Sequence, residues 1–374
     1  MVSPISYGSH TSRITKIDPL LAVDQLKTLL LVEQKYRVPH VLCQAFSEEN
    51  SRHPYGDWRR KICQWSFKVI DHFKLDREVV SSAMNILDRY LASGNNCLDK
   101  MEVYADQQEC IRTIDSRTFQ LTAMTSLYLS MKISDNGESQ YSSSRKLKLN
   151  SFVELSRGQF CADEITEMER TILNELQWKI FPPTPMTAVS FLLHLMPSRK
   201  TLPYTCHKSY DLVLHVLHEL ARYLTELSVC HGSICASHTS SQVAYACILL
   251  SMELLTPIAL PFDAREEFNE TVATISLLSG GTVLTYQDKA MRYLQDVLRD
   301  SFWPEMLVDD FEYHEIGHPI SMAKDFGLLD MSYIVSSHSS IIPSGTLLSH
   351  HHPLSDPFKE PDLEGSPVCV NRHY

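Results

Sequence analysis

Glycine is scarce in this sequence, with only 12 among 374 residues, roughly half of the usual share of about 7%. Segments in which apolar and polar residues alternate, as they do in half-buried strands, are also few. The hydrophobic content of 44% is nevertheless ordinary for a protein with a real core. Together, the scarcity of glycine and of alternating patterns favours a chain built from helices.

Long apolar runs are missing as well, because no segment approaches the roughly 20 apolar residues that span a bilayer. Residues 1–10, MVSPISYGSH, lack the basic and then apolar pattern of a secretory signal peptide. We therefore expect an intracellular protein, in the nucleus, the cytoplasm or both, with no membrane partner.

Cysteine is present, but without the spacing of a redox motif or a metal knuckle. The ten cysteines run from Cys43 to Cys369 with no C-x-x-C pair, and most lie in apolar helical patterns. In a reducing compartment such residues are small core side chains rather than a disulfide framework. Four zinc-type ligands fall within residues 230–238, but their C-x4-C spacing differs from that of a tight zinc knuckle, so we predict no metal site. They are Cys230, His231, Cys235 and His238.

Sequence motifs of catalysis are also missing. The chain contains no G-x-x-x-x-G-K-[ST], G-x-G-x-x-G, H-E-x-x-H or G-x-S-x-G. Asp325, Phe326 and Gly327 spell the metal-binding triplet of protein kinases, but the H-R-D and A-P-E segments that a kinase needs are absent. We predict a protein that is not an enzyme and that uses no cofactor.

The sequence also lacks an excess of basic residues, since the formal net charge is −11. Proteins that bind nucleic acids derive much of their affinity from neutralising phosphates with Lys and Arg. We therefore expect no nucleic-acid partner.

Helical periodicity is what the sequence does contain. The stretch TFQLTAMTSLYLSMK at 118–132 has almost no polar face before Lys132, and a helix that is apolar all round is normally buried all round. Residues 239–255 have the same character. The segment FPPTP at 181–185 separates the two halves, because proline cannot continue a helix. Helices are predicted over 18–36, 58–73, 77–92, 118–132, 150–156, 161–177, 186–195, 207–229, 239–255, 263–277 and 284–300.

Each half thus contains about five helices with an apolar third member, which indicates two copies of one five-helix unit. We assign an N-terminal arm with one helix to residues 1–56, the first unit to 57–183, the second to 184–304 and a disordered tail to 305–374. Ser, Pro, His and acidic residues dominate the tail, and such a composition cannot bury enough apolar surface to offset the cost of ordering. Residues 94–115 form a long polar loop without an assigned role.

Three stretches resemble the cyclin family. MNILDRYLAS at 84–93 looks like the VNYLDRFLS segment of cyclins, and LQWKIFPPTP at 176–185 resembles the end of the first cyclin box and the linker after it. Residues 118–132 align without gaps to the third helix of that box. The resemblance is strong over 18–196 and weaker over 197–303. It implies an all-α fold of two tandem five-helix cyclin boxes, preceded by an N-terminal helix and followed by the disordered tail.

The resemblance also implies roles for individual residues. In cyclins the third helix of the box is the central one, and its final lysine lies at the kinase-binding surface. Lys132 matches that lysine, and Glu169 matches its glutamate partner. Arg59 and Asp88 match a pair that has a structural role inside the first box.

The surface that receives substrate peptides in cell-cycle cyclins departs here from the family pattern. Its apolar positions fall on Trp58, Ile62 and Trp65, whereas two further positions carry Lys61 and Lys68. A peptide of the basic-x-Leu type would face like charges there, which disfavour binding. We expect only weak docking of substrate proteins.

The function that the resemblance implies is that of a cyclin. Such a protein is a regulatory subunit that binds and allosterically activates a cyclin-dependent serine/threonine kinase and so controls cell-cycle progression. Two alternatives remain, a transcription-associated member of the same fold and a helical scaffold that does not activate a kinase. The subclass, the kinase partner and the substrates stay open, because residues 1–50 contain no R-x-x-L signal and the chain contains no L-x-C-x-E motif.

Overall fold

The computed structural model describes residues 19–39, 42, 55–93, 114–134, 148–198, 210–306 and 327–329. Over these residues all regular secondary structure is helical apart from one isolated bridge between Leu255 and Leu329, so the predicted all-α class is confirmed. The helices are α1 (Pro19–Val32), η1 (Glu33–Tyr36), α3 (Tyr55–Phe73), α4 (Glu78–Ala92), α5 (Ser116–Ser134), α6 (Leu149–Leu155), α7 (Ala162–Glu175), α8 (Pro185–Leu193), α9 (Tyr210–Val229), α10 (Gly232–Ser237), α11 (Ser240–Glu253), α12 (Phe262–Ser279) and α13 (Lys289–Met306).

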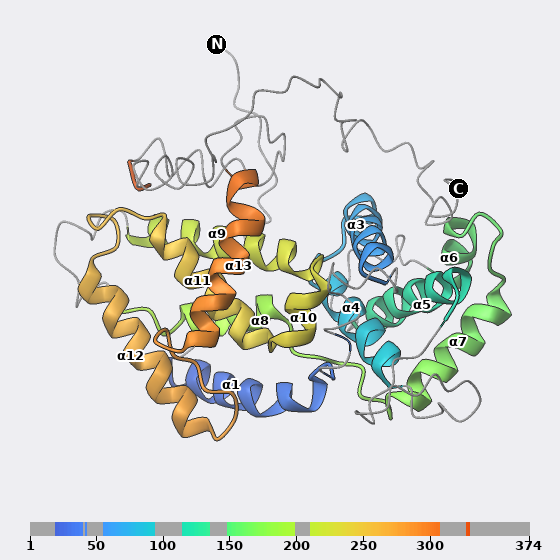
Figure 1. Ribbon diagram of the computed structural model, residues 1–374, viewed down its shortest axis with the longest axis horizontal. Helices are drawn as coiled ribbons and strands as arrows, with labels where there is room; N and C mark the ends of the chain where they lie inside the picture. Colours follow the sequence, from blue (N-terminus) through green and yellow to red (C-terminus); the bar gives the residue numbers. More distant parts are fainter. Residues whose placement is uncertain are drawn as a thin grey trace, which may run out of the picture.

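The helices form two groups that lie side by side (Figure 1). Helices α3 to α7 enclose one hydrophobic core, which includes Phe119 and Phe152. Helices α8 to α13 enclose a second core, which includes Ile248. The proline-rich linker lies between the groups, where Thr184 caps α8 and Pro185 occupies its first turn. Proline suits that position because the first N–H groups of a helix have no intrahelical partner.

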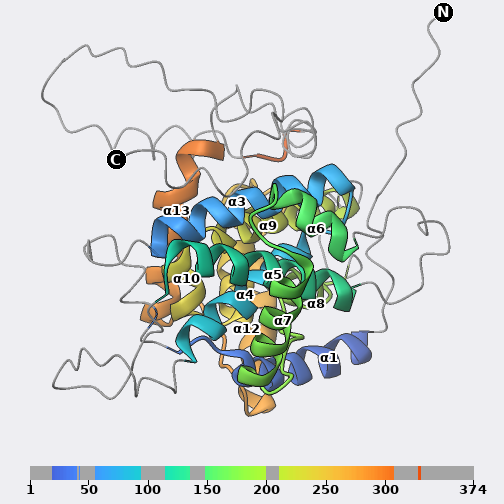
Figure 2. The same cartoon turned by 90° about the vertical axis from the view of Figure 1, so that its right-hand side faces the viewer.

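Helix α5 is the central helix of the first group and packs against α3, α4, α6 and α7 (Figure 2). Its buried hydroxyl groups are hydrogen-bonded, as buried polar groups generally are. Thr125 Oγ1 donates to the carbonyl oxygen of Leu121 at 2.7 Å, and Ser130 Oγ donates to that of Val79 on α4 at 2.9 Å. The predicted burial of this helix is confirmed, and the side chain of Lys132, in its last turn, is 48% exposed.

Helix α11 has the same place in the second group, where it packs against α8, α9 and α13. It begins with a capping box, in which Thr239 Oγ1 accepts from the Gln242 backbone nitrogen and Gln242 Oε1 accepts from that of Thr239. The hydroxyl of Tyr245 donates to Asn269 Oδ1 on α12 at 3.0 Å. A buried central helix thus recurs in both groups.

Helix α1 packs on the second group although it precedes the first group in the sequence (Figure 1). It contacts α8 and α12, and Leu26 and Leu30 are buried in the second core. The chain passes very close at Gly281, where a Cβ atom would lie 2.3 Å from the carbonyl oxygen of Leu30. No residue other than glycine fits this approach. The predicted arm therefore attaches to the second group through α1.

Two helix assignments differ from the expectation. Residues 232–237 form α10, whereas the sequence predicted a loop there, because a helix of six residues is too short to display a periodic pattern. Helix α13 begins at Lys289 rather than near residue 284. A turn precedes it, and Asp288 Oδ1 accepts from the backbone nitrogen of Ala290 at 3.0 Å. This is the type of cap that starts a helix.

Five residues of the predicted tail are described: 305 and 306 end α13, which contradicts the prediction of disorder there, and two of the residues 327–329 are buried. Leu328 and Leu329 join the second core, and the Leu328 carbonyl oxygen accepts from the backbone nitrogen of Thr256 at 2.8 Å. The rest of the tail beyond residue 306, and residues 94–113 of the polar loop, lie outside the described residues. Across the residues that are described, no helix has both the length and the apolarity needed to cross a membrane.

Candidate functional site

Lys132 and Glu169, which are 37 positions apart in the sequence, form an ion pair at the surface of the first group. Lys132 Nζ lies 2.6 Å from Glu169 Oε1. The same ammonium lies 5.0 Å from the ring centroid of Tyr128, within the range of a cation–π contact. The Glu169 side chain is only 16% exposed, whereas that of Lys132 is 48% exposed. The carboxylate is therefore shielded and the ammonium faces outward.

Helices α5 and α7 position Lys132 and Glu169, respectively. Lys132 lies in the last turn of α5, where the helix dipole favours a cation. Helix α7 buries Ile165 and Ile172 against the core, so Glu169, which lies between them in sequence, is at the edge of the buried stripe. A second ion pair, Arg117 with Glu164, joins the same helices at 2.5 Å. An exposed pair is worth only about 0–1 kcal/mol to folding, so we expect this pair to add little to stability.

Large apolar side chains are exposed just beyond α7. Trp178 is 69% exposed and Phe181 is 62% exposed. Gln177 and Trp178 both have left-handed backbone dihedrals, with φ of 52° and 61°, and the Trp178 backbone nitrogen donates to the Leu173 carbonyl oxygen at 2.9 Å. Left-handed conformations of residues other than glycine are strained and persist only when the surroundings enforce them. Sequence reasoning assigned no role to Trp178, although its segment was the one that resembled the end of a cyclin box.

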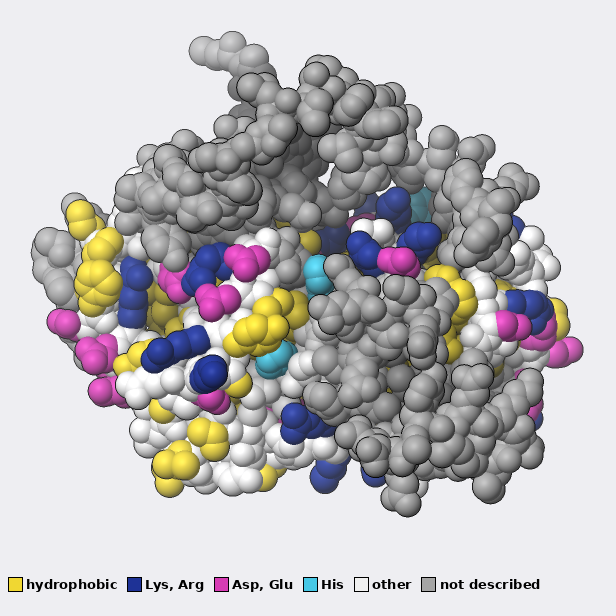
Figure 3. Space-filling view, in the orientation of Figure 1, with side chains coloured by type: hydrophobic (Ala, Val, Ile, Leu, Met, Phe, Trp, Pro, Cys, Tyr) yellow, Lys and Arg dark blue, Asp and Glu magenta, His cyan; other side chains and the backbone are white. Residues whose placement is uncertain are grey.

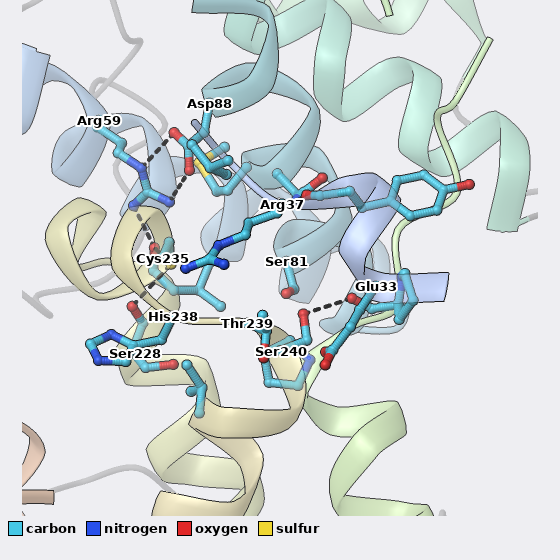
Figure 4. Close-up of a pocket in the computed structure, with 18 residues that line it drawn as sticks. Glu33, Arg37, Arg59, Ser81, Asp88, Ser228, Cys235, His238, Thr239 and Ser240 are labelled. Carbon is cyan, nitrogen blue, oxygen red and sulfur yellow. Dashed lines mark hydrogen bonds and ion pairs between the residues drawn. The ribbon is translucent and has the colours of Figure 1, made fainter. Parts of the chain in front are cut away.

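Arg59 and Asp88 form a fully buried pair between α3 and α4 (Figure 4). Arg59 Nε lies 2.8 Å from Asp88 Oδ1, and Arg59 Nη2 lies 2.7 Å from Oδ2, a two-bonded geometry that fixes both side chains. Arg59 Nη1 also donates to the carbonyl oxygen of Val229, at the end of α9. Burial raises the pKa of Asp88, and the positive charge of Arg59 opposes that shift. The pair ties the first group to the second.

A cavity of about 50 Å³ lies beside this pair, where η1, α4 and the α9–α11 segment meet (Figure 4). Its lining combines apolar side chains with polar ones, which include Glu33, Arg37, Ser240 and His238. A volume of this size holds a few water molecules. Burial is the main cause that lowers the pKa of His238, so that ring is neutral near pH 7. The cavity lies where the two groups meet and is too small for a large ligand.

The predicted docking patch is divided between surface and core. Ile62 is 2% exposed and packs in the first core. Trp58 is half-buried, with its ring centroid 5.4 Å from that of Phe119, and Trp65 is half-buried against the same core. Lys61 and Lys68 are exposed, as the docking prediction assumed. The surface available to a peptide is thus narrower than the sequence implied.

Further large apolar side chains are exposed near the two ends of α12, in the other group of helices. Ile258 and Phe262 near its start, and Leu277 and Leu278 near its end, are between 67% and 79% exposed, and hydrophobic side chains are visible on this side of the molecule in Figure 3. These side chains lie on the opposite group from Lys132 and Glu169, so they are not part of the candidate site. Elsewhere in the described part of the chain, no three His, Cys, Asp or Glu side chains are arranged to hold a metal ion.

Comparison with known proteins identifies the same family in several ways. Residues 24–181 match the model of the "Cyclin, N-terminal domain". The soybean (Glycine max) protein "G2/mitotic-specific cyclin S13-6" is 28% identical over 217 residues, which are 57% of this chain and 38% of that protein. "G2/mitotic-specific cyclin cig1" of Schizosaccharomyces pombe is 26% identical over 201 residues, 53% of this chain and 38% of that protein.

A third relative, "Cyclin-A1-2" of Arabidopsis thaliana, is 24% identical over 209 residues, 56% of this chain and 39% of that protein. The chain thus spans well under two thirds of the length of these relatives. Their names include mitotic and A-type cyclins, so the subclass stays open. With an all-helical fold in which two buried central helices recur, these matches show that the chain is similar to the cyclins, with residues 24–181 corresponding to their N-terminal domain.

Proposed function

We propose that this chain is the regulatory subunit of a cyclin-dependent serine/threonine kinase, which it binds and activates to control cell-cycle progression. The relatives named above carry the names of cell-cycle cyclins, which supports a role of this kind. The proposed partner is the catalytic kinase subunit, and substrate proteins would dock only weakly at Trp58 and Trp65. The protein itself would catalyse no reaction and would need no cofactor.

The ion pair of Lys132 and Glu169 is the observation on which this proposal rests. Its ammonium is exposed and its carboxylate is shielded, so the pair presents one fixed cation rather than two free charges. Lys132 can donate to backbone carbonyl groups of a partner helix, while Glu169 fixes its position. A docked kinase would exclude water from the pair, which strengthens both interactions.

The exposed Trp178 and Phe181 supply the apolar part of the same proposed surface. They follow the helix that carries Glu169, and large aromatic side chains that become buried dominate the energetics of many interfaces. A charged pair beside apolar anchors therefore provides both orientation and affinity. The strained backbone at Trp178 keeps the indole directed outward in the free protein, so binding would require little reordering.

Activation follows from the requirements of the kinase. A protein kinase needs its β3 lysine paired with a glutamate of the αC helix, and the position of that helix controls activity. A cyclin that packs against αC binds the active arrangement better than the inactive one and shifts the population toward it. The surface formed by α5 and α7 is the part of this chain that we assign to that contact.

The direct test is to reconstitute the full chain with cyclin-dependent kinase subunits and to measure both binding and phosphorylation of a histone-type substrate. The proposal expects a stable complex and a large gain in kinase activity. Binding without a gain would favour the non-activating scaffold, and absence of binding to any such kinase would contradict the proposal. When Lys132 or Glu169 is substituted in this assay, the variant Arg60→Ala serves as the control, because Arg60 forms another exposed ion pair, with Asp57 on α3.

A further inference from the structure

Two cysteine side chains meet at the boundary between the two groups of helices. Cys63 lies in the middle of α3 and is fully buried. Cys230 lies in the turn that follows α9 and is half-buried. Their sulfur atoms are 3.3 Å apart, although the residues are 167 positions apart in the sequence. The sequence gives no sign of this contact, since neither residue belongs to a short cysteine motif.

The two sulfur atoms lie close together, but they are too far apart to be bonded as a disulfide. A disulfide has a sulfur–sulfur distance of about 2.05 Å, so the two sulfur atoms would have to approach by roughly 1.2 Å. Cys63 is fixed within a helix, whereas Cys230 lies in the turn that follows α9. The contact is therefore one that small movements of a single turn can convert into a covalent bond.

We propose that Cys230 and Cys63 form an oxidisable thiol pair, which hydrogen peroxide converts into a disulfide that joins the two cyclin units. Cys230 is the residue that meets the oxidant, because it is the only one of the two with any exposure. Cys63, buried directly behind it, is the residue that closes the bond. This proposal does not depend on kinase binding.

The electrostatic surroundings agree with these roles. The hydrogen bond between Cys230 and Cys63 is the main cause that lowers the pKa of Cys230; burial opposes this shift, and the charges of Arg59 and Arg77 add to it. Burial is the main cause that raises the pKa of Cys63 well above its usual range. Cys230 thus supplies the thiolate, the form of cysteine that reacts, while Cys63 keeps its proton until the second step.

The chemistry balances in two steps. The Cys230 thiolate attacks one oxygen of hydrogen peroxide, the O–O bond breaks, and the departing hydroxide takes a proton to become water, which leaves a sulfenic acid on Cys230. The Cys63 sulfur then attacks the Cys230 sulfur, the S–O bond breaks, and the hydroxide leaves with the Cys63 proton as a second water. One peroxide is reduced by two electrons, and two thiols are oxidised to one disulfide. A dithiol reductant reverses the reaction.

A third cysteine lies nearby and provides the main competitor. Cys235, in α10, donates from its sulfur to the carbonyl oxygen of Ser228 at 3.5 Å. Burial raises its pKa to about 11, so it remains a thiol at neutral pH and is a poor nucleophile toward peroxide. The pKa of Cys63 is raised as well, so the contact decides: the Cys63 sulfur lies 3.3 Å from that of Cys230, and we expect Cys230 to pair with Cys63 rather than with Cys235.

The test uses the reduced full chain treated with hydrogen peroxide. Free thiols are then blocked, the protein is digested without reductant, and cross-linked peptides are identified by mass spectrometry. The expected result is an intrachain Cys63–Cys230 peptide that disappears after treatment with a dithiol. It should be absent in Cys63→Ser and Cys230→Ser, and it should persist in Cys235→Ser and in Cys247→Ser, which removes a buried cysteine of α11.

Two results would overturn the proposal. One is a cross-link from Cys230 to Cys235 or to any other cysteine in place of Cys63. The other is a peroxide-treated protein in which a sulfenic-acid probe labels Cys230 while no cross-link forms. Circular dichroism of each variant shows whether it is folded. If Cys63→Ser is not folded, the peptide map of the wild-type chain and the Cys230→Ser and Cys235→Ser variants still decide the outcome.

Discussion

The carboxylate of Glu33 lies at the N-terminus of α11, where its Oε2 accepts a hydrogen bond from the backbone nitrogen of Ser241 at 3.0 Å. Its Oε1 accepts from the Ser241 hydroxyl at 2.6 Å and from the hydroxyl of Thr282. Glu33 itself is only 3% exposed. The segment that follows α1 thus caps the central helix of the second unit, and the helix dipole favours a negative charge at this position.

Glu33→Ala should lower the free energy of unfolding by about 1–3 kcal/mol, because buried donors on Ser241 and Thr282 lose their acceptor. Glu33→Gln keeps one acceptor oxygen and removes a buried charge, so it should cost less. Urea denaturation of both variants and the wild type at pH 7 measures the difference. No loss of stability in Glu33→Ala would show that the hydrogen bonds contribute nothing.

The difference in stability between Glu33→Gln and the wild type should also depend on pH. Burial is the main cause that raises the pKa of Glu33, and the hydrogen bonds from Ser241 and Thr282 oppose that shift. Because the pKa is higher in the folded than in the unfolded state, the contribution of Glu33 is most favourable below the ordinary value of 4.5. It is lost as the pH rises through the folded-state pKa. The stability of Glu33→Gln relative to the wild type should therefore increase from about pH 4.5 to pH 7.

Removal of one member of the Arg59–Asp88 pair should strongly lower the free energy of unfolding. Asp88→Leu leaves a buried guanidinium without its carboxylate, and such changes cost roughly 3–5 kcal/mol. The double variant Arg59→Met with Asp88→Leu removes both charges, so it should be more stable than Asp88→Leu alone. The comparison uses denaturation midpoints, or the soluble fraction where a variant does not fold. A double variant less stable than the single one would contradict this account.

Lys132→Ala and Glu169→Ala should weaken kinase binding with little effect on folding. Truncation of one member of a buried, hydrogen-bonded charge pair at an interface costs roughly 2–5 kcal/mol, or about 30-fold to several-thousand-fold in affinity. The melting temperature of the free chain should shift little, since an exposed pair stabilises folding by about 0–1 kcal/mol. Binding titrations and thermal denaturation provide the two measurements.

A reversed pair sharpens this test. The double variant Lys132→Glu with Glu169→Lys retains an ion pair within the chain but presents the opposite charges to a partner. If the pair matters only for folding, the reversed pair should bind the kinase like the wild type. Our proposal expects the reversed pair to remain folded and to lose binding.

Trp178→Ala should reduce kinase affinity by more than about 1 kcal/mol, the loss that marks residues important to an interface. The side chain is 69% exposed in the free chain, so its removal should leave the melting temperature almost unchanged. The matched control is Tyr293→Ala, which truncates a ring that is 65% exposed on α13 of the other unit. Equal effects of the two substitutions on affinity would exclude a specific role for Trp178.

The helices themselves were largely determined by local sequence. The all-round apolar pattern of residues 118–132 predicted a buried helix that ends at Lys132, and α5 is buried as expected but continues two residues further, to Ser134. Periodic patterns also predicted most of the other helices, because burial of one face leaves a repeat that a single chain displays. The short helix α10 escaped prediction, since six residues contain no complete repeat.

The relations between distant segments were decided by the tertiary structure alone. The packing of α1 on the second unit, the contact between Cys63 and Cys230 and the outward position of Trp178 have no local signature. Lys132 and Glu169 were linked in advance only by resemblance to cyclins, whereas their contact depends on how α5 and α7 pack. A sequence pattern specifies which face of a helix is apolar, but the partner of that face is selected by the free energy of packing the whole chain, to which every other segment contributes.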